Sequence, residues 1–287
     1  MRPVTWSRRT RLAVVASVAA AAAAVSAVAF SATGPAIQTW TPKSERQITN
    51  IDVLRQQIRN YYGDPLGTGV VGPDSNYVRE ASAVAASGER WLAWRARAPV
   101  RGAKGHGLQK AIVLDVDDTT LATWNYEIAS NWAYNPTTNA AYVTDQKFPA
   151  VPGMVDLVTT AAEKGYAVFY LTGRPAAQED ATLGNLTADG VGEDAGYPAP
   201  TALPDGEDGL FTKPAVADYP DYLKAACATE ISTGASCSTI HYKAATREHI
   251  ESLGYDIVAN FGDQYSDLKG GSADRGFKLP NPNYFLP

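Results

Sequence analysis

The chain has 287 residues, of which 45% are hydrophobic and 19% are charged, and its formal net charge is −5. This composition is that of a globular protein and excludes a largely disordered chain. An acidic chain without a basic patch also argues against binding to nucleic-acid backbones. The length suffices for one large domain, or for a core domain with an appendage.

Residues 1–36 have the pattern of a secretory signal peptide. Four Arg precede an apolar, Ala-rich run over 12–30, and small residues follow, with Ala27-Val-Ala29 as the best cleavage triplet and 32–36 as later options. The alternative is a retained membrane anchor, since the run approaches spanning length; Ala is only weakly apolar, which favours removal. We therefore expect an exported, extracellular protein that keeps no membrane anchor once the signal is removed.

Two further features of the sequence bear on export: the arginine-rich start of the chain and its cysteines. Ser7-Arg-Arg-Thr-Arg-Leu12 resembles a twin-arginine signal, so the Sec and twin-arginine routes both stay open. Removal of residues 1–36 would remove four Arg and no acid, which takes the formal net charge from −5 to −9. Cys227 and Cys237 are the two cysteines of the chain. In an exported protein we expect them to pair, which closes a short loop and stabilises the fold by roughly 2–3 kcal/mol.

Residues 37–107 are expected to form an N-terminal helical appendage with a linker. Apolar residues recur every three or four positions over 48–62, which predicts a helix. Gly and Pro break the pattern over 63–75, a second helix is predicted over 76–98, and 101–107 has a linker composition. The two helices are expected to pack against the domain that follows.

From 108 to 287 predicted strands alternate with predicted helices. Buried strands are indicated by apolar runs over 111–114, 167–171 and 257–261, a short strand over 240–242, and helices over 155–164 and 243–254. Pro175 is expected to open the helix after the second strand, and about 184–236, rich in Gly, Pro and Asp, is expected to be an irregular insertion. The alternation predicts an α/β fold with a Rossmann-like, doubly wound parallel sheet.

Each of the three main predicted strands ends in polar side chains. In chain order they are Asp115 and Asp117, then Thr172 and Gly173, then Asp263 and Asp267, with Lys243 at the start of a helix between the last two. The carboxyl ends of parallel strands share one edge of a sheet, which is where such sheets bind ligands. We therefore expect these residues to converge on one pocket.

This set of side chains suits phosphoryl transfer. Clustered carboxylates match the oxygen preference of Mg²⁺, while a hydroxyl, backbone N–H groups and a Lys can hold phosphate oxygens. One carboxylate can attack phosphorus and another can protonate the leaving alcohol. Taken singly, Thr172 reads as a helix cap, Lys243 as a surface charge and Asp267 as one more acid on a helix. Their order along the chain and their placement at successive strand ends favour a site.

Four segments resemble the sequence motifs of the haloacid dehalogenase (HAD) superfamily. They are Asp115-Val-Asp-Asp-Thr-Thr-Leu121, Leu171-Thr-Gly-Arg-Pro175, Tyr242-Lys-Ala-Ala-Thr-Arg247 and Phe261-Gly-Asp-Gln-Tyr-Ser-Asp-Leu268. Within this superfamily the chain is similar to the secreted acid phosphatases of class B and class C (subfamily IIIB) and to plant vegetative storage proteins. The segment Phe277-Lys-Leu-Pro-Asn-Pro-Asn-Tyr284 also resembles the C-terminal ending of this group. The resemblance covers about 108–284 and implies a HAD-type phosphatase domain over 108–287 with a small cap.

The resemblance also implies a role for each motif residue. It implies Asp115 as the nucleophile, Asp117 as the general acid and base, and Thr172, Gly173 and Lys243 as phosphate-binding residues. A Mg²⁺ ion would be held by Asp115, the backbone carbonyl of Asp117 and Asp263, with Asp267 in support. Trp124 and Tyr126 come from an aromatic cluster that could stack on a leaving group or form the core of the cap; of that cluster, these two are expected to approach substrate. Arg174 could contact substrate or form an ion pair.

The function expected from these features is that of an exported, Mg²⁺-dependent acid phosphatase. It would hydrolyse small phosphate monoesters, such as nucleotide, aryl or sugar phosphates, through an aspartyl-phosphate. Two alternatives stay open: a non-catalytic binding or storage protein on the same scaffold, and a phosphotransferase that uses an alcohol as acceptor. The intact acids argue against the storage protein, and phosphotransfer would show as a phosphorylated acceptor.

Overall fold

The computed structural model describes residues 41–99, 108–187, 195–204 and 206–286. The signal peptide expected over 1–36 and the linker expected over 101–107 therefore lie outside the described residues. Within the described part of the chain, no helix is both long and apolar enough to cross a membrane.

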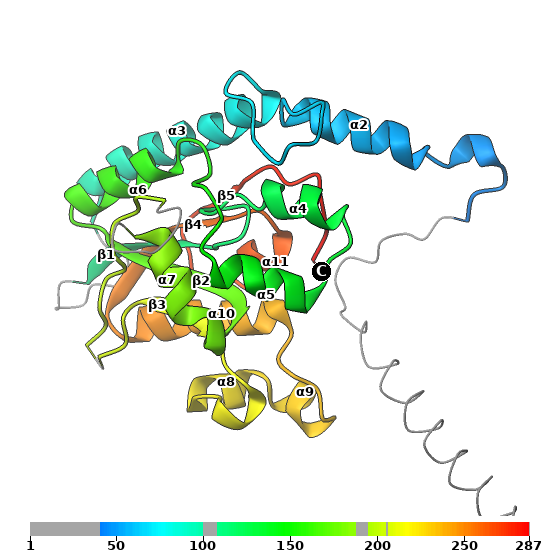
Figure 1. The fold of residues 1–287 in the computed structure, drawn as a ribbon. Coiled ribbons are helices and arrows are strands. Elements are labelled where there is room, and N and C mark those ends of the chain that lie inside the picture. The colour runs from blue at the N-terminus through cyan, green and yellow to red at the C-terminus, as the bar shows by residue number, and fades with distance from the viewer. Residues whose placement is uncertain (1–40, 100–107, 188–194, 205, 287) are drawn as a thin grey trace, which may run out of the picture. The chain divides into compact units, whose positions relative to one another are not determined.

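A five-stranded parallel sheet forms the centre of the domain (Figure 1). In chain order the strands are β1 Gln109–Leu114, β2 Ala167–Pro175, β3 Leu210–Lys213, β4 Tyr255–Gly262 and β5 Gly276–Lys278. In space their order is β3-β2-β1-β4-β5. Because the chain leaves β1 first to one side and later to the other, the sheet is doubly wound, and the predicted fold class is confirmed.

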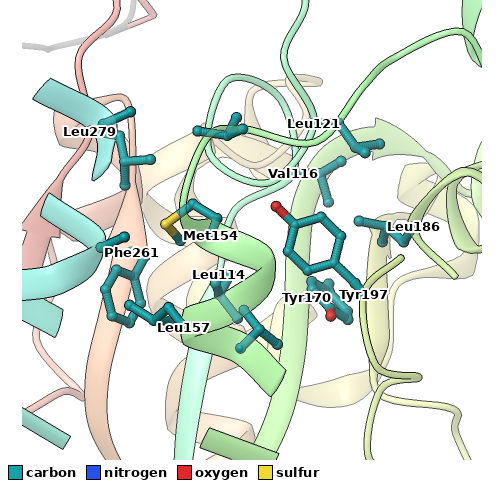
Figure 2. Close-up of a cluster of buried hydrophobic side chains, with 14 of the residues drawn as sticks. Leu114, Val116, Leu121, Met154, Leu157, Tyr170, Leu186, Tyr197, Phe261 and Leu279 are labelled. Atoms are coloured by element: carbon teal, nitrogen blue, oxygen red, sulfur yellow. The ribbon is translucent and has the colours of Figure 1, made fainter. Parts of the chain in front are cut away.

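Side chains of β1 alternate between two hydrophobic cores, one on each face of the sheet. Ile112 and Leu114 belong to one core, and Ala111 and Val113 to the other. Where both faces of a strand are covered its residues must be apolar, which is why 111–114 of β1 form a continuous apolar run. Figure 2 shows part of the first core, where Leu114 lies among side chains of the neighbouring strands and helices.

Two helical layers cover the sheet (Figure 1). The layer over the first core contains α3 (Asn76–Arg97) and α6 (Met154–Glu163), and the layer over the second contains α8 (Asp221–Ala226) and α10 (Thr239–Ser252). Shorter elements complete the described chain: η2 Glu45–Gln47, α2 Ile51–Tyr61, α4 Trp124–Ser130, α5 Pro136–Thr144, η3 Ala176–Gln178, α7 Glu179–Leu186, η4 Val216–Asp218, α9 Ala228–Ser232 and α11 Tyr265–Leu268.

The long N-terminal helix α3 packs tightly onto the domain. Ser75 caps it by accepting a hydrogen bond from the Val78 backbone N–H at 3.2 Å. Gly88 lies where α3 crosses the core, and a Cβ there would come within 2.6 Å of Leu157 and 2.8 Å of Phe261. The residues of α2 are exposed or half-buried, so α3 provides most of the contact between the N-terminal helices and the sheet.

Three local expectations were wrong. Residues 240–242 lie in α10, because Ser238 caps this helix by accepting from the His241 N–H at 3.2 Å. Pro175 is the last residue of β2 and α7 begins at Glu179, since the strand continues through the polar residues after the apolar run. The segment 184–236 is not a surface insertion throughout, because β3 within it is a buried edge strand. The expected disulfide between Cys227 and Cys237 is present.

Candidate active site

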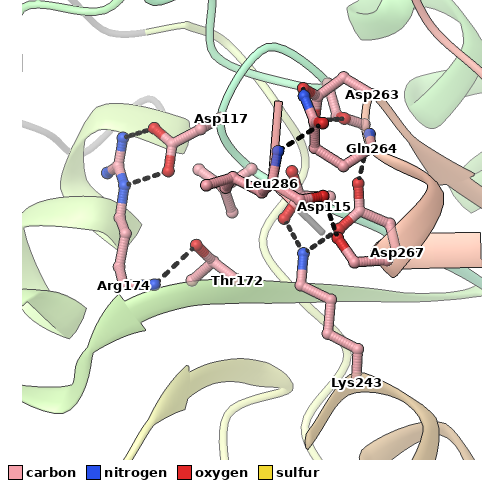
Figure 3. Close-up of polar contacts among 12 residues, drawn as sticks. Asp115, Asp117, Thr172, Arg174, Lys243, Asp263, Gln264, Asp267 and Leu286 are labelled. Atoms are coloured by element: carbon pink, nitrogen blue, oxygen red, sulfur yellow. Dashed lines mark hydrogen bonds and ion pairs between the residues drawn. The ribbon is translucent and has the colours of Figure 1, made fainter. Parts of the chain in front are cut away.

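The polar residues predicted at the strand ends do meet at one edge of the sheet. Asp115 follows β1 directly, Thr172 lies near the end of β2, and Asp263 follows β4. These strands are hydrogen-bonded neighbours in the order β2-β1-β4, so their carboxyl ends lie side by side. Figure 3 shows the resulting group of side chains, with Lys243 approaching from α10.

Lys243 is a buried cation between two carboxylates. Its side chain is 4% exposed, and its Nζ donates to Asp115 Oδ1 and, at 2.6 Å, to Asp267 Oδ1 (Figure 3). Burial alone would lower the pKa of Lys243, but attraction to Asp115 and Asp267 outweighs burial and raises the pKa above its ordinary value. The ordinary reading of Lys243 as a solvated surface charge is therefore wrong.

Asp267 is held in place through its side chain and its backbone. Its Oδ2 accepts from the Gln264 N–H at 2.8 Å, which caps α11, and Lys243 holds Oδ1. The carbonyl of Asp267 accepts from Arg247 Nη1 at 2.7 Å. Gly262 leaves room for this arrangement, since a Cβ there would come within 2.3 Å of the Asp267 Cβ.

Three buried carboxylates form a group that suits a divalent cation. Asp115, Asp263 and Asp267 each offer one oxygen within 4.8 Å of the others. Burial and repulsion from the neighbouring carboxylates raise the pKa of Asp115 well above its ordinary value, despite the attraction of Lys243. Burial raises the pKa of Asp263 to about 7, together with repulsion from Asp267 and Asp118. A cation among these oxygens would remove the repulsion, and an all-oxygen set is what Mg²⁺ prefers.

Asp117 lies apart from Asp115 and faces Arg174. The guanidinium donates through Nη2 to Asp117 Oδ1 at 2.7 Å and through Nε to Asp117 Oδ2 at 3.1 Å, a bidentate pair (Figure 3). A third bond runs from Arg174 Nη1 to Thr182 Oγ1 at 3.0 Å, and Arg174 is 6% exposed. Strand alternation does not relate the directions of Asp115 and Asp117, because β1 ends at Leu114.

The end of β2 places a hydroxyl and an open backbone beside these acids. Thr172 is buried, and its Oγ1 accepts from the Arg174 N–H at 3.1 Å, so this hydroxyl turns the chain rather than capping a helix. Gly173 is exposed, and among the described residues a Cβ on it would meet open space. An anion could therefore approach the backbone at Gly173 without a steric conflict.

Trp124 and Tyr126, both in α4, lie in a buried aromatic core rather than on a surface open to substrate. Trp124 is 1% exposed, stacks on Tyr62 with ring centroids 4.2 Å apart, and donates to Asp64 at 3.0 Å. Tyr126 is 2% exposed, and its hydroxyl donates to the Asn135 carbonyl at 3.0 Å. Burial of both rings supports the alternative in which the aromatic cluster is structural.

Several site residues were missed by the analysis of the sequence. Asp118 is fully buried with φ of 52°, accepts from the Thr123 N–H at 2.9 Å and from the Thr123 hydroxyl at 2.6 Å, and has a pKa raised by burial to about 7. Gln264 and Asn281 each donate to Asp263 Oδ2 at 2.7 Å. Asp118, Gln264 and Asn281 all lie in segments that resemble the HAD motifs or the ending of the family, but neither composition nor periodicity assigns them a role.

The comparisons with known proteins agree with this geometry. The family model described as HAD superfamily, subfamily IIIB (acid phosphatase) matches residues 23–287. Vegetative storage protein 2 of Arabidopsis thaliana is 28% identical over 179 residues, 61% of this chain and 56% of that protein. Acid phosphatase 1 of Solanum lycopersicum is 27% identical over 178 residues, 61% of this chain and 58% of that protein. The matches thus span less than two thirds of these relatives.

A solved structure shows the same fold. The class C acid phosphatase from Bacillus anthracis superimposes with a TM-score of 0.51, covering 81% of this chain and 86% of that one. The sequence identity is 21%, so the likeness concerns the fold alone.

Proposed function

Because the chain belongs to the HAD superfamily, subfamily IIIB (acid phosphatase), we propose that it hydrolyses small phosphate monoesters at the carboxylate group around Asp115. The observation that carries the proposal is the burial of Asp115 at the end of β1, in contact with Lys243 and grouped with Asp263 and Asp267. A carboxylate so placed is oriented for attack and has positive charge beside it where a phosphate would bind.

The proposed reaction has two steps, each with a named carboxyl group. An oxygen of Asp115 attacks phosphorus as the bond from phosphorus to the alcohol oxygen breaks, and Asp117 gives that oxygen its proton. Asp117, now a carboxylate, takes a proton from water, which attacks phosphorus and releases inorganic phosphate while Asp115 regains its carboxylate. Arg174 orients Asp117 through two hydrogen bonds, one of which must open when Asp117 carries its proton.

Phosphate oxygens would be held by groups that surround Asp115. Lys243 supplies positive charge, while Thr172 and the backbone of Gly173 supply hydrogen-bonding groups at the end of β2. Asp115, Asp263 and Asp267 would hold Mg²⁺, together with the backbone carbonyl of Asp117. When bound, this ion neutralises charge that would otherwise keep a carboxylate from a phosphate dianion.

Hydrolysis of p-nitrophenyl phosphate and of a nucleoside monophosphate tests the proposal directly. We expect activity with Mg²⁺, loss of it with EDTA, and loss of it in Asp115→Asn with the fold intact by circular dichroism. Substantial activity in Asp115→Asn would refute the assigned nucleophile. The same assay with an added alcohol reports phosphotransfer, if the alcohol becomes phosphorylated.

A non-catalytic storage protein is the second candidate, because the relatives include vegetative storage proteins. A folded, Mg²⁺-loaded protein that hydrolyses no ester of a broad panel would favour it. Export is proposed as well, supported by the basic and apolar pattern of residues 1–36 and by the disulfide. N-terminal sequencing of protein recovered from outside the cell would find a start within about 30–37 if the signal peptide is removed.

A further inference from the structure

The C-terminal segment 279–286 lies against the loop that carries Asp263. The backbone N–H of Leu279 donates to the Gly262 carbonyl at 2.9 Å. The N–H of Leu286 donates to Gln264 Oε1 at 3.0 Å (Figure 3). We call residues 279–286 the C-terminal strap. The bond from Leu279 completes the pairing of β4 with β5, whereas the contacts of 281–286 lie beyond the sheet and need a different explanation.

Two amide side chains hold the same oxygen of Asp263. Asn281 Nδ2 and Gln264 Nε2 both donate to Asp263 Oδ2, each at 2.7 Å. The other oxygen, Oδ1, accepts the Thr119 hydroxyl at 3.3 Å. With Oδ2 occupied by two donors, the plane and direction of the carboxylate are set.

The strap also decides which end of each amide faces Asp263. A backbone N–H can only donate, so the atom of Asn281 that meets the Asn283 N–H at 2.8 Å is Oδ1. By the same reasoning the atom of Gln264 that meets the Leu286 N–H is Oε1. Both NH₂ groups therefore point at the carboxylate. The second hydrogen of Asn281 Nδ2 reaches Asp118 at 3.5 Å.

We propose that Asn281 is a positioning residue that, through the C-terminal strap, orients Asp263 for a divalent cation. The proposal rests on the Mg²⁺ site of the proposed function and adds to it the residue that tunes its affinity. A hydrogen-bond partner of a metal-binding carboxylate lowers the reorganisation needed on binding, and its loss commonly weakens affinity by about 10–100-fold.

The strap also connects this site to the rest of the protein. Asn283, two residues further on, donates through Nδ2 to the Tyr62 hydroxyl at 2.9 Å and accepts from Trp132 Nε1 at 3.3 Å. Its side chain thus touches Tyr62, just after α2, and Trp132, just after α4, while that of Asn281 touches Asp263. Asn283 is therefore a matched control from the same segment.

The test compares Mg²⁺ binding by wild type, Asn281→Leu, Asn281→Ala and Asn283→Ala in the full chain. Titration calorimetry gives the Kd for Mg²⁺, and p-nitrophenyl phosphate hydrolysis gives the Mg²⁺ concentration for half-maximal rate. We expect both Asn281 variants to bind Mg²⁺ about 10–100-fold more weakly and to recover kcat within about threefold at saturating Mg²⁺. Asn283→Ala should bind within about twofold of wild type, with any loss confined to thermal stability.

Each other outcome overturns a separate statement. If wild-type protein binds no Mg²⁺, the metal site of the proposed function is refuted, whatever the variants do. If wild type binds and hydrolyses while both Asn281 variants match its Kd, the positioning role is refuted and the proposed function stands. Equal weakening in Asn281→Ala and Asn283→Ala also refutes it, because the strap would then act through stability alone.

Discussion

Replacing Lys243 by Met tests whether this buried cation holds the carboxylates together. Met keeps much of the length of the side chain and removes its charge, so Asp115 and Asp267 lose the group that bridges them. Both carboxyls are buried, and Asp115 already has a raised pKa because of burial and repulsion. Without Lys243 its pKa should rise further, and the charged form should become costly in the folded protein.

The expected loss follows from the burial of this ion pair. Removing one partner of a buried pair costs about 3–5 kcal/mol of unfolding free energy, because the other charge stays buried and uncompensated. The loss should be largest near pH 7 without Mg²⁺ and smaller near pH 5, where a carboxyl can take up a proton. Catalysis should fall as well, by about 10²–10³-fold in kcat, as for the loss of one group that stabilises transition-state charge.

Urea unfolding at pH 5 and pH 7, with and without Mg²⁺, measures the free energies. Lys224→Met is the matched control, since the Lys224 side chain is 55% exposed and pairs with Asp221 at 3.4 Å on the surface. Such a pair contributes roughly 0–1 kcal/mol, so the control should unfold almost like wild type. A Lys243→Met protein within about 1 kcal/mol of wild type at pH 7 without Mg²⁺ would refute the reasoning.

Three further predictions concern the acid–base pair, the core and the pH dependence. Arg174→Lys keeps the charge but loses the fork that holds Asp117, so kcat in steady-state assays should fall by about 10-fold or more, with stability little changed; an unchanged kcat would contradict this. Gly88→Ala should cost about 1–3 kcal/mol in urea unfolding, because its Cβ would come within 2.6 Å of Leu157; a stabilised variant would show that the helix shifts freely. The pKa of Asp263 is raised from 3.8 to about 7, so the stability that its proton supplies is complete below pH 3.8 and lost as the pH rises through 7. In a thermal scan, metal-free protein should therefore have a lower melting temperature at pH 7 than at pH 5, and Mg²⁺ should reduce this difference. Equal melting temperatures of the metal-free protein at the two pH values would contradict the prediction.

Local sequence was enough to predict the central strands and the acids at their ends. β1, β2 and β4 are buried on both faces, so each leaves a continuous apolar run that needs no tertiary information to detect. Asp115 and Asp263 follow such runs directly, and parallel strands bring their ends together. The helices α3 and α6 were predicted within a few residues, since their apolar positions recur at helical spacing.

The edge strands were missed because they are short and their surroundings look like loops. β3 has four residues within a segment rich in Gly and Asp, and β5 has three. Segments this short show no hydrophobic periodicity. Both become strands because a neighbouring strand of the sheet offers an unpaired edge. The start of α10 was misread for a similar reason: a run of three residues does not distinguish strand from helix, and the cap at Ser238 decided it.

At the site, the sequence determined which chemical groups are present, and the tertiary structure decided their partners. Four polar motifs identify carboxylates, a hydroxyl and a Lys suited to phosphoryl transfer. The bidentate hold of Arg174 on Asp117, the burial of Lys243 between Asp115 and Asp267, and the donation from Asn281 to Asp263 join residues from 18 to 128 positions apart in the chain. Such contacts leave no periodicity, because they depend on how strands and helices pack, and packing is set by the whole chain.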